Sequence, residues 1–420
     1  MDFNIFLARF GLSPDNFVNK LNEPIPFEKG FIYEVEEQKR DVFSPCCHEK
    51  AYINNYNTIE YNCSNIEYID DVIRIKRIRY RCSKCGKTFT LKLDGIPRNA
   101  KVTRQNLLLM FQDFKKTIPF SDIASKYKIS TMRVIQIFNE NFPYINRLPM
   151  PEIMCVDEIY FKDQVLETKY SCILYDYKKR SIVDMIVSRQ KGILDEYFSS
   201  ISTKELQNVK FFVSDMYDVY ASIRAKFFPN AIHIVDIFHV IRLLTVAVNQ
   251  LRVRAMNTKT EKGSLHYKFM SSHYKLFLCR HENIPNKFYI LKSTGEIFHY
   301  DDLVFDCLKL DSYLTIGYSV LQDLFHYSNM HTYTEALNFI EFIYGRLIGC
   351  GNELLEEVGK SYKKWRFEIA SAFSSAYKGS RITNSIAENT NNKIKTLYKV
   401  GYGYRNFQTF RNRIMYILNK

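Results

Sequence analysis

The chain has 420 residues, a formal net charge of +14 and a hydrophobic content of 46%. That size allows several domains with buried cores, and that hydrophobic content excludes wholesale disorder. No apolar run approaches the roughly 18 residues that span a bilayer, and the first residues, MDFNIFLARFGLSPDNF, lack the features of an export signal. We therefore expect a soluble, cytoplasmic protein without a membrane partner.

The positive charge is concentrated in two stretches. Eleven Lys or Arg and one acid lie between Arg74 and Arg104, and seven Lys or Arg and no acid lie between Lys393 and Lys420. Basic stretches of this kind favour a polyanion, through phosphate contacts and the release of counterions. A solvated basic face without a partner is the alternative, but two separate clusters favour nucleic acid.

The N-terminal region, residues 1–95, contains five of the ten cysteines. A disulfide framework is not expected in a cytoplasmic protein. The sequence CSKCGKTF has the two-residue spacing of a zinc knuckle, and SPCCHEKAY supplies further sulfur and nitrogen ligands upstream. We expect a zinc ribbon; two buried cysteine pairs without metal are the alternative. The expected ligands are Cys47, Cys82 and Cys85, with Cys46 or His48 as the fourth.

Residues 96–148 are predicted to form a helix-turn-helix domain. In IPFSDIASKYKISTMRVIQIFNEN, residues 118–141, apolar residues repeat at helical spacing on both sides of a short turn. Ser130 or Thr131 can cap the second helix, which can then enter the major groove with Thr131 and Arg133 as DNA contacts. Any helical hairpin with a polar cap gives the same pattern, but the zinc ribbon in front of it favours DNA binding.

Five strand-like runs follow the break LPMPE at residues 148–152. They are EIMCVDEIYFK, YSCILYDYKK, SIVDMIVSR, VKFFVSD and AIHIVD, with helical segments between the later ones. Three strands in succession and then alternating helix and strand predict a mixed α/β sheet over residues 150–250. Helical periodicity dominates residues 251–375, and residues 376–420 are also predicted to be helical.

Three acids are candidates for one site. Asp157 lies within MCVDEIYF and Asp215 ends VKFFVSD, and a carboxylate at the end of a buried strand is costly unless a cation or hydrogen-bond donors meet it. Glu388 would share a helix face with Asn392 and Lys395. Each acid also has a structural explanation, because both aspartates can be solvated strand ends and Ser385 with Glu388 matches a capping box.

Several stretches together resemble the transposases of bacterial insertion sequences of the ISL-three family. They are VDEIYFK, VSDMYDVYASIRAKFFPNAIHIVDIFHVIRLL and NSIAENTNNKIKTLYKVGYGYRNFQTFRNRI. The resemblance implies a multidomain α/β protein in which a zinc ribbon and a helix-turn-helix precede a ribonuclease-H-like mixed sheet. It also implies an all-helical insertion at residues 251–375, which fits the 388 − 215 = 173 residues between the second aspartate and the glutamate.

The resemblance also assigns roles to residues. Asp157, Asp215 and Glu388 are implied as the catalytic acids of a DDE site. Asp236 and His239 match the D-x-x-H signature, with a structural or DNA-positioning role near the site. A neutral core histidine bonded to its i−3 neighbour is the alternative for His239. Trp365, in the insertion, is expected to be a core residue. The chain reads Ser-Pro-Cys-Cys where the family usually has Cys-Pro-x-Cys, which leaves the fourth zinc ligand open.

The activity implied is two-metal DNA strand cleavage and strand transfer at the nucleoid of a bacterial cell. Three carboxylates can hold two Mg²⁺ or Mn²⁺ ions, in addition to a structural Zn²⁺. The partners implied are the terminal inverted repeats and target DNA, and joining two ends suggests at least a homodimer. Further expected DNA contacts are Asn392, Lys393, Lys395, Arg405, Arg411 and Arg413. The alternatives are a non-catalytic zinc and helix-turn-helix regulator, an inactivated transposase, and a ribonuclease-H-like nuclease that cuts RNA–DNA hybrids.

Overall fold

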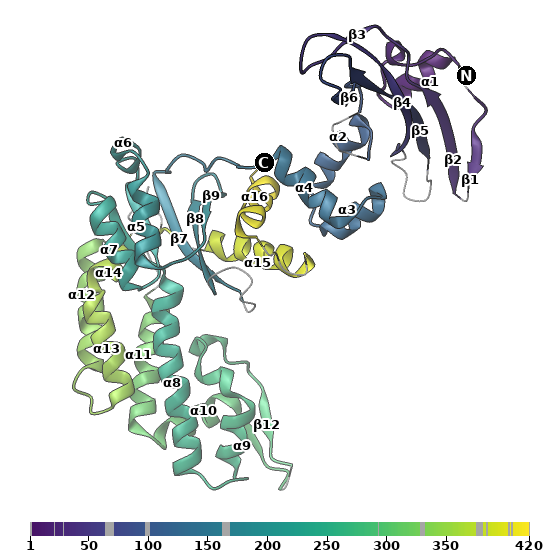
Figure 1. Cartoon of the computed structure of the whole chain (residues 1–420). Coiled ribbons are helices and arrows are strands. Elements are labelled where there is room, and N and C mark those ends of the chain that lie inside the picture. The colour runs from purple at the N-terminus through teal and green to yellow at the C-terminus, as the bar shows by residue number, and fades with distance from the viewer. Residues whose placement is uncertain are drawn as a thin grey trace. The chain divides into compact units, whose positions relative to one another are not determined.

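The computed structural model describes residues 2–20, 22–27, 29–63, 71–96, 101–161, 169–292, 294–327, 332–374, 381–383, 385–401, 404 and 406–419. They form two compact units, Met1–Asn146 together with Lys393–Lys420, and Arg147–Asn392 (Figure 1). The division falls inside one helix, α15 (Ser385–Val400). This differs from the predicted domains, in which residues 376–420 all belong to the catalytic core, because residues 393–420 pack with residues 1–146 instead.

A six-stranded sheet forms the first part of the N-terminal unit. Its central strand, β5 (Val72–Cys82), is antiparallel to β4 (Lys50–Asn62) and parallel to β2 (Gly30–Glu36). The remaining elements here are β1 (Ile25–Phe27), β3 (Val42–Phe43), β6 (Thr88–Thr90), helix α1 (Phe3–Arg9) and the 3-10 turn η1 (Pro14–Asn16). On each side of the consecutive cations Lys76 and Arg77, apolar or aromatic residues of β5 alternate with arginine or lysine, the period-two pattern of a half-buried strand.

The two halves of β5 bury opposite faces. Ile73 and Ile75 pack with α1 in one hydrophobic cluster, whereas Ile78 and Tyr80 belong to another. Because successive side chains of a strand point to opposite faces, the odd-numbered residues are covered in the first half and the even-numbered ones in the second. The cations that face solvent therefore change sides along β5.

Helices complete the N-terminal unit. They are α2 (Arg104–Asp113), α3 (Phe120–Tyr127), α4 (Thr131–Asn141) and α16 (Phe407–Leu418). The two helices predicted over residues 118–141 are thus present. Lys128 ends α3 in the left-handed conformation (φ 53°), and the Ser130 hydroxyl begins α4 by accepting a hydrogen bond from the Arg133 N–H at 3.2 Å.

A five-stranded mixed sheet forms the centre of the second unit, in the order β11-β10-β7-β8-β9. The first three strands along the chain are antiparallel neighbours, and β10 and β11 are parallel to β7. Their bounds are β7 (Ile153–Tyr160), β8 (Tyr170–Asp176), β9 (Ser181–Ile186), β10 (Phe211–Ser214) and β11 (Ile232–Val235). All five strands lie within the runs predicted from the sequence.

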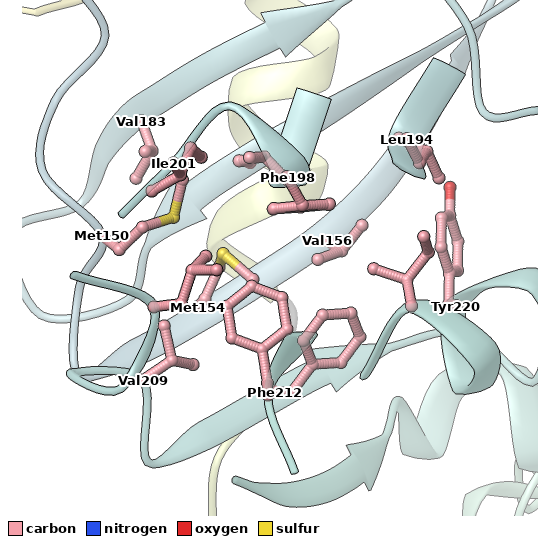
Figure 2. Packing of buried hydrophobic residues seen from close by; sticks show 14 of the residues in the cluster. Met150, Met154, Val156, Val183, Leu194, Phe198, Ile201, Val209, Phe212 and Tyr220 are labelled. Carbon is pink, nitrogen blue, oxygen red and sulfur yellow. The ribbon is translucent and has the colours of Figure 1, made fainter. Parts of the chain in front are cut away.

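Helices α5 (Lys191–Ser199) and α7 (Asp218–Phe227) cover one face of this sheet. Figure 2 shows the core between them, where Met154 and Val156 of β7 and Phe212 of β10 pack with Phe198 of α5 and Tyr220 of α7. A short helix, α6 (Thr203–Leu206), lies between α5 and β10 in the chain. The alternate residues Asp157 and Cys155 of β7 point to the other face.

The segment predicted to be an all-helical insertion is mostly helical but also contains a small two-stranded sheet, β12 (Phe288–Ile290) with β13 (Ile297–His299). The expectation of an all-helical insertion is therefore wrong in this detail. Trp365 is 5% exposed, as expected of a core residue. The helices are α8 (Ile237–Lys259), α9 (Leu265–Ser272), η2 (Tyr274–Phe277), η3 (His281–Asn283), α10 (Tyr300–Lys309), α11 (Ser312–His326), α12 (Tyr333–Leu347), α13 (Glu353–Lys364) and α14 (Arg366–Phe373). Among the helices that the structure describes, none combines the length and apolar character that crossing a bilayer requires.

Candidate active site and DNA-binding elements

Three aspartates occupy equivalent positions at one edge of the five-stranded sheet. Val213 of β10 lies opposite Cys155 of β7, and Ser214 lies opposite Val235 of β11. One or two residues further along each strand, the same register places Asp215 between Asp157 and Asp236. Because neighbouring strands are about 4.8 Å apart, this edge concentrates three carboxylates.

Asp215, Asp236 and His239 form the closest group at this edge. One ligand atom from each lies within 4.8 Å of the others. The Nε2 atom of His239 is 3.1 Å from Oδ1 of Asp215, and this oxygen is shielded from solvent without a hydrogen bond from any described residue. Two potential acceptor atoms at that distance require a proton or a cation between them. Asp236 also begins α8 by accepting a hydrogen bond from the Phe238 N–H at 3.3 Å.

A buried amide holds the carboxylate of Asp157. The Asn391 side chain donates from Nδ2 to Oδ2 of Asp157 at 2.7 Å, and the Glu158 N–H donates to Oδ1 at 2.7 Å. The Asn391 amide oxygen in turn accepts from the hydroxyl of Tyr175, which is 1% exposed. This hydroxyl fixes the orientation of the amide, because the amide must then present its N–H₂ group to the aspartate.

Glu388 is exposed on α15, three residues before Asn391. Residues three apart on a helix have Cβ atoms about 5–6 Å apart, so the bond from Asn391 to Asp157 brings the helix turn that carries Glu388 towards the first aspartate. Helix α15 exposes Asn392 and Lys395 together with Glu388, as predicted. Among the described residues, however, the three predicted catalytic acids do not form a set whose ligand atoms all lie within 4.8 Å of one another. The capping alternative involves the side chain of Ser385, which lies outside the described residues.

Burial and mutual repulsion keep protons on this site. Burial, then the neighbouring Asp215, raises the pKa of Asp157 from 3.8 to about 7. Burial, then the neighbouring Asp236, raises the pKa of Asp215 from 3.8 to about 7. Both shifts mean that negative charge is unfavourable at this edge without a counter-charge. A divalent cation would supply that counter-charge.

Four cysteine sulfur atoms converge in the N-terminal unit. The Sγ atoms of Cys46, Cys47, Cys82 and Cys85 all lie within 4.8 Å of one another, and those of Cys46 and Cys85 are 3.3 Å apart. Tetrahedral zinc with Zn–S bonds of about 2.3 Å needs sulfurs roughly 3.8 Å apart, so the group has the dimensions of a Cys₄ site. A hydrogen bond from the Cys85 backbone N–H lowers the pKa of Cys82 to about 6, which favours the thiolate that zinc binds. Cys46, and not His48, joins the other three.

The two residues of α4 that were predicted to contact DNA, Thr131 and Arg133, differ in exposure and in hydrogen bonding. Thr131 is exposed at the first position of the helix. The Arg133 guanidinium is bonded along its own helix to Gln136 at 3.2 Å and to Glu140 at 3.1 Å. Arg133 must therefore release an acidic partner before it can reach a base or phosphate.

The arginines of α16 are buried, which corrects the prediction that they hold DNA phosphates. Arg413 is 1% exposed, lies 4.7 Å from the ring centre of Phe120, and donates to the Lys116 carbonyl at 3.1 Å. Burial lowers the pKa of Arg413 to about 10. Arg411 is 4% exposed and donates to the Ile145 carbonyl at 2.9 Å. Both guanidinium groups thus lie inside the helical packing of this unit rather than on its surface.

The remaining predicted DNA contacts fall into two groups. Lys393 and Lys395 are exposed on α15. Arg405 lies outside the described residues.

Neither Asn391 nor Tyr175 was predicted from the sequence to be a site residue. The signal for Asn391 was available, since it follows Glu388 by three residues on the same helix. Tyr175 carries no such signal, because it is separated from Asn391 by 216 positions in the chain.

In a comparison with known families, a model described as transposase, for the DDE enzymes of the ISL-three group, matches residues 154–414. The matched segment contains the sheet edge with its three aspartates, the insertion and α15. A comparison with curated proteins gives no match.

Proposed function

The chain belongs to the ISL-three family of DDE transposases, since the family model matches 414 − 154 + 1 = 261 of its 420 residues, and we propose that it cuts the ends of its insertion sequence and joins them to target DNA. The observation that carries this proposal is the register of β7, β10 and β11, which places three carboxylates side by side at one sheet edge. The strand order, with three antiparallel strands followed by two strands parallel to the first, supports a ribonuclease-H-like core.

We assign the divalent cations to Asp157, Asp215 and Glu388. The solvent-shielded Oδ1 atom of Asp215, which has no hydrogen bond from a described residue, and the raised pKa values of both aspartates fit this assignment. Bound Mg²⁺ or Mn²⁺ supplies Lewis acidity for water or 3′-hydroxyl attack on phosphorus. His239 and Asp236 flank Asp215, and Nε2 of His239 lies 3.1 Å from its Oδ1.

The protein's own residues orient the first aspartate. Asn391 and the Glu158 N–H each occupy one lone pair on a different oxygen of Asp157, which leaves further acceptor capacity on both oxygens. Tyr175 prevents the amide from rotating. Asn391 thereby also fixes α15, the helix on which Glu388 is exposed.

We assign recognition of the terminal inverted repeats to the N-terminal unit. Cys46, Cys47, Cys82 and Cys85 would hold Zn²⁺, and α4 would enter the major groove with Thr131 first. Of the other predicted contacts, Asn392, Lys393 and Lys395 remain candidates for the DNA backbone, since all three are exposed. Synapsis of two ends would require at least two copies of the chain.

The test is cleavage of a labelled duplex that carries the DNA flanking the protein's own coding sequence, with MgCl₂ or with EDTA. Asp157→Ala, Asp215→Ala and Glu388→Ala should each abolish magnesium-dependent cleavage and retain binding. Asp306→Ala, which removes an exposed acid paired with Lys309, is the control and should cleave normally. Binding without cleavage by the wild-type chain would instead indicate a DNA-binding regulator, and cleavage confined to RNA–DNA hybrids would indicate a hybrid-specific nuclease.

A further inference from the structure

The cations of β5 differ in whether acids neutralise them. In the first half of the strand, Arg74 pairs with Glu34 at 2.8 Å and Lys76 pairs with Glu36 at 3.2 Å, both acids being on β2. Arg77 is buried against Glu37 at 2.8 Å. Strand β2 stops pairing with β5 at Lys76, so its acids do not extend to the second half.

The second half of β5 carries Arg79 and Arg81, both exposed. Among the residues that the structure describes, neither forms an ion pair. They are two residues apart, so they point to the same face, opposite the cluster that contains Ile78 and Tyr80. This face is therefore the part of the basic stretch whose charge is not compensated.

Neighbouring strands extend these arginines into two polar rows. One row is Tyr52, Arg81 and Thr88, and the other is Asn55, Arg79 and Thr90, from β4, β5 and β6 in that order. All six residues are exposed and none is acidic. Each row therefore sets one guanidinium between hydrogen-bonding side chains on both sides, as a surface that contacts phosphate oxygens requires.

The cysteine turn next to this face orients one of the arginines. Arg81 immediately precedes Cys82, and its Nε atom donates to the Gly86 carbonyl at 3.2 Å. Gly86 has φ 69° and closes the turn through its own N–H, which donates to the Cys82 carbonyl at 3.1 Å. The turn that would bind metal through Cys82 and Cys85 thus also holds the stem of Arg81, leaving its terminal nitrogens for a ligand.

From this arrangement we infer that the β4-β5-β6 face, defined by Tyr52, Asn55, Arg79, Arg81, Thr88 and Thr90, is a second DNA-binding surface that grips the phosphate backbone of a duplex without reading its sequence. The inference rests on the proposed function and adds to it a surface distinct from α4. Charge complementarity selects the partner, since a face with two uncompensated guanidinium groups and no acid fits a polyanion.

The experiment measures duplex affinity by fluorescence anisotropy over a range of KCl concentrations, with the full chain and a labelled duplex from the DNA flanking its coding sequence. Each phosphate contact contributes about 0.9 to the slope of log K against log [salt]. Arg79→Ala should lower the slope by about 1, Arg79→Ala/Arg81→Ala by about 2, and Arg79→Lys should keep it near the wild-type value. A scrambled duplex should show the same losses, because backbone contacts carry no sequence information.

Lys76→Ala is the matched control, since it removes a cation of the same strand that points to the other face and is already paired with Glu36. It should leave the slope unchanged. Circular dichroism and metal content show whether each variant is folded. If the wild type binds duplex and the folded Arg79 and Arg81 variants keep its slope, this surface is refuted while the proposed function stands. If the slopes change with single-stranded DNA alone, the assignment to duplex is wrong. If the wild type binds no DNA, the proposed function itself fails.

Discussion

Asparagine in place of Asp215 removes a charge that the folded, metal-free protein holds at a cost. The pKa of this carboxyl rises from 3.8 to about 7 on folding, through burial and the nearby Asp236. One pKa unit corresponds to about 1.4 kcal/mol, so the gain in unfolding free energy has an upper limit of about 4.5 kcal/mol. Because the acids share their repulsion, part of which returns on the neighbouring carboxyls, we expect a gain of roughly 1–2 kcal/mol.

The stability advantage of Asp215→Asn over the wild type should increase as the pH rises. A raised pKa means that the folded protein binds more protons than the unfolded chain between about pH 4 and pH 7, so wild-type stability falls as pH rises through that window. Asp215→Asn should therefore match the wild type near pH 4 and exceed it most above pH 7. Millimolar MgCl₂ should reverse the order at pH 8, because a cation that binds only the folded wild type stabilises it.

Trp365 provides the assay. It is the only tryptophan in the chain, is buried and belongs to the second unit, so its fluorescence in a urea titration follows that unit alone. Asp306→Asn is the control, since its side chain is 52% exposed and should change stability by less than about 0.5 kcal/mol. A variant less stable than the wild type at pH 8 without magnesium, or an advantage that is equal at pH 4 and pH 8, would refute the argument.

Three further predictions follow from the hydrogen bonds and sulfur ligands described above. Cys82→Ser should release a zinc ion and destabilise the N-terminal unit, because zinc affinity contributes directly to folding. Metal content is measured with a chelating dye, and Cys350→Ser is the control. Full retention of metal by Cys82→Ser would contradict the four-sulfur site. Tyr175→Phe should slow strand cleavage about ten-fold at unchanged DNA affinity, since the freed amide no longer holds the first aspartate. The control, Tyr318→Phe, removes a hydroxyl that lies 3.2 Å from a histidine nitrogen elsewhere, and it should cleave normally. Equal cleavage rates for the two variants would exclude a positioning role for Tyr175. Asn412→Ala should lower the free energy of unfolding by about 2–3 kcal/mol, because two backbone carbonyls and one N–H lose a partner that is 1% exposed. Hydrogen exchange of the amides of α4 should then accelerate. Unchanged protection of α4 would show that its stability does not depend on this contact with α16.

Local signals in the sequence predicted most elements correctly. The Ser130 cap and the apolar spacing around it gave α3 and α4, and short apolar runs gave β7 to β11. Asp215 was recognisable because it ends such a run. Asp236 stood out in the sequence because His239 follows it by three residues. Its place beside Asp215 depends on the register between two strands, and the sequence of one strand alone does not determine that register.

The features that could not be predicted from the sequence depend on contacts between residues that are far apart in the chain. A guanidinium that meets a phosphate and one that is buried against aromatic rings have the same appearance in a sequence, so the burial of Arg411 and Arg413 could not be predicted. The sequence likewise does not tell which basic residues of β5 are paired with acids, because the glutamates that neutralise Arg74 and Lys76 belong to another strand. The position of Asn391 beside Glu388 was visible in the sequence, but its two hydrogen-bond partners, in β7 and β8, are more than 200 residues earlier in the chain and could not be predicted.

The burial of Arg413 among the rings of α2, α3 and α4 has a consequence for biosynthesis. Residues 407–418 leave the ribosome only after the whole of the second unit has been translated. Until then, Phe114 and Phe138, both fully buried in the finished unit, lack the helix that covers them. Nascent chains and products of premature termination should therefore expose this apolar surface, and the packing of α3 and α4 should be completed only once translation has passed the three aspartates and Glu388.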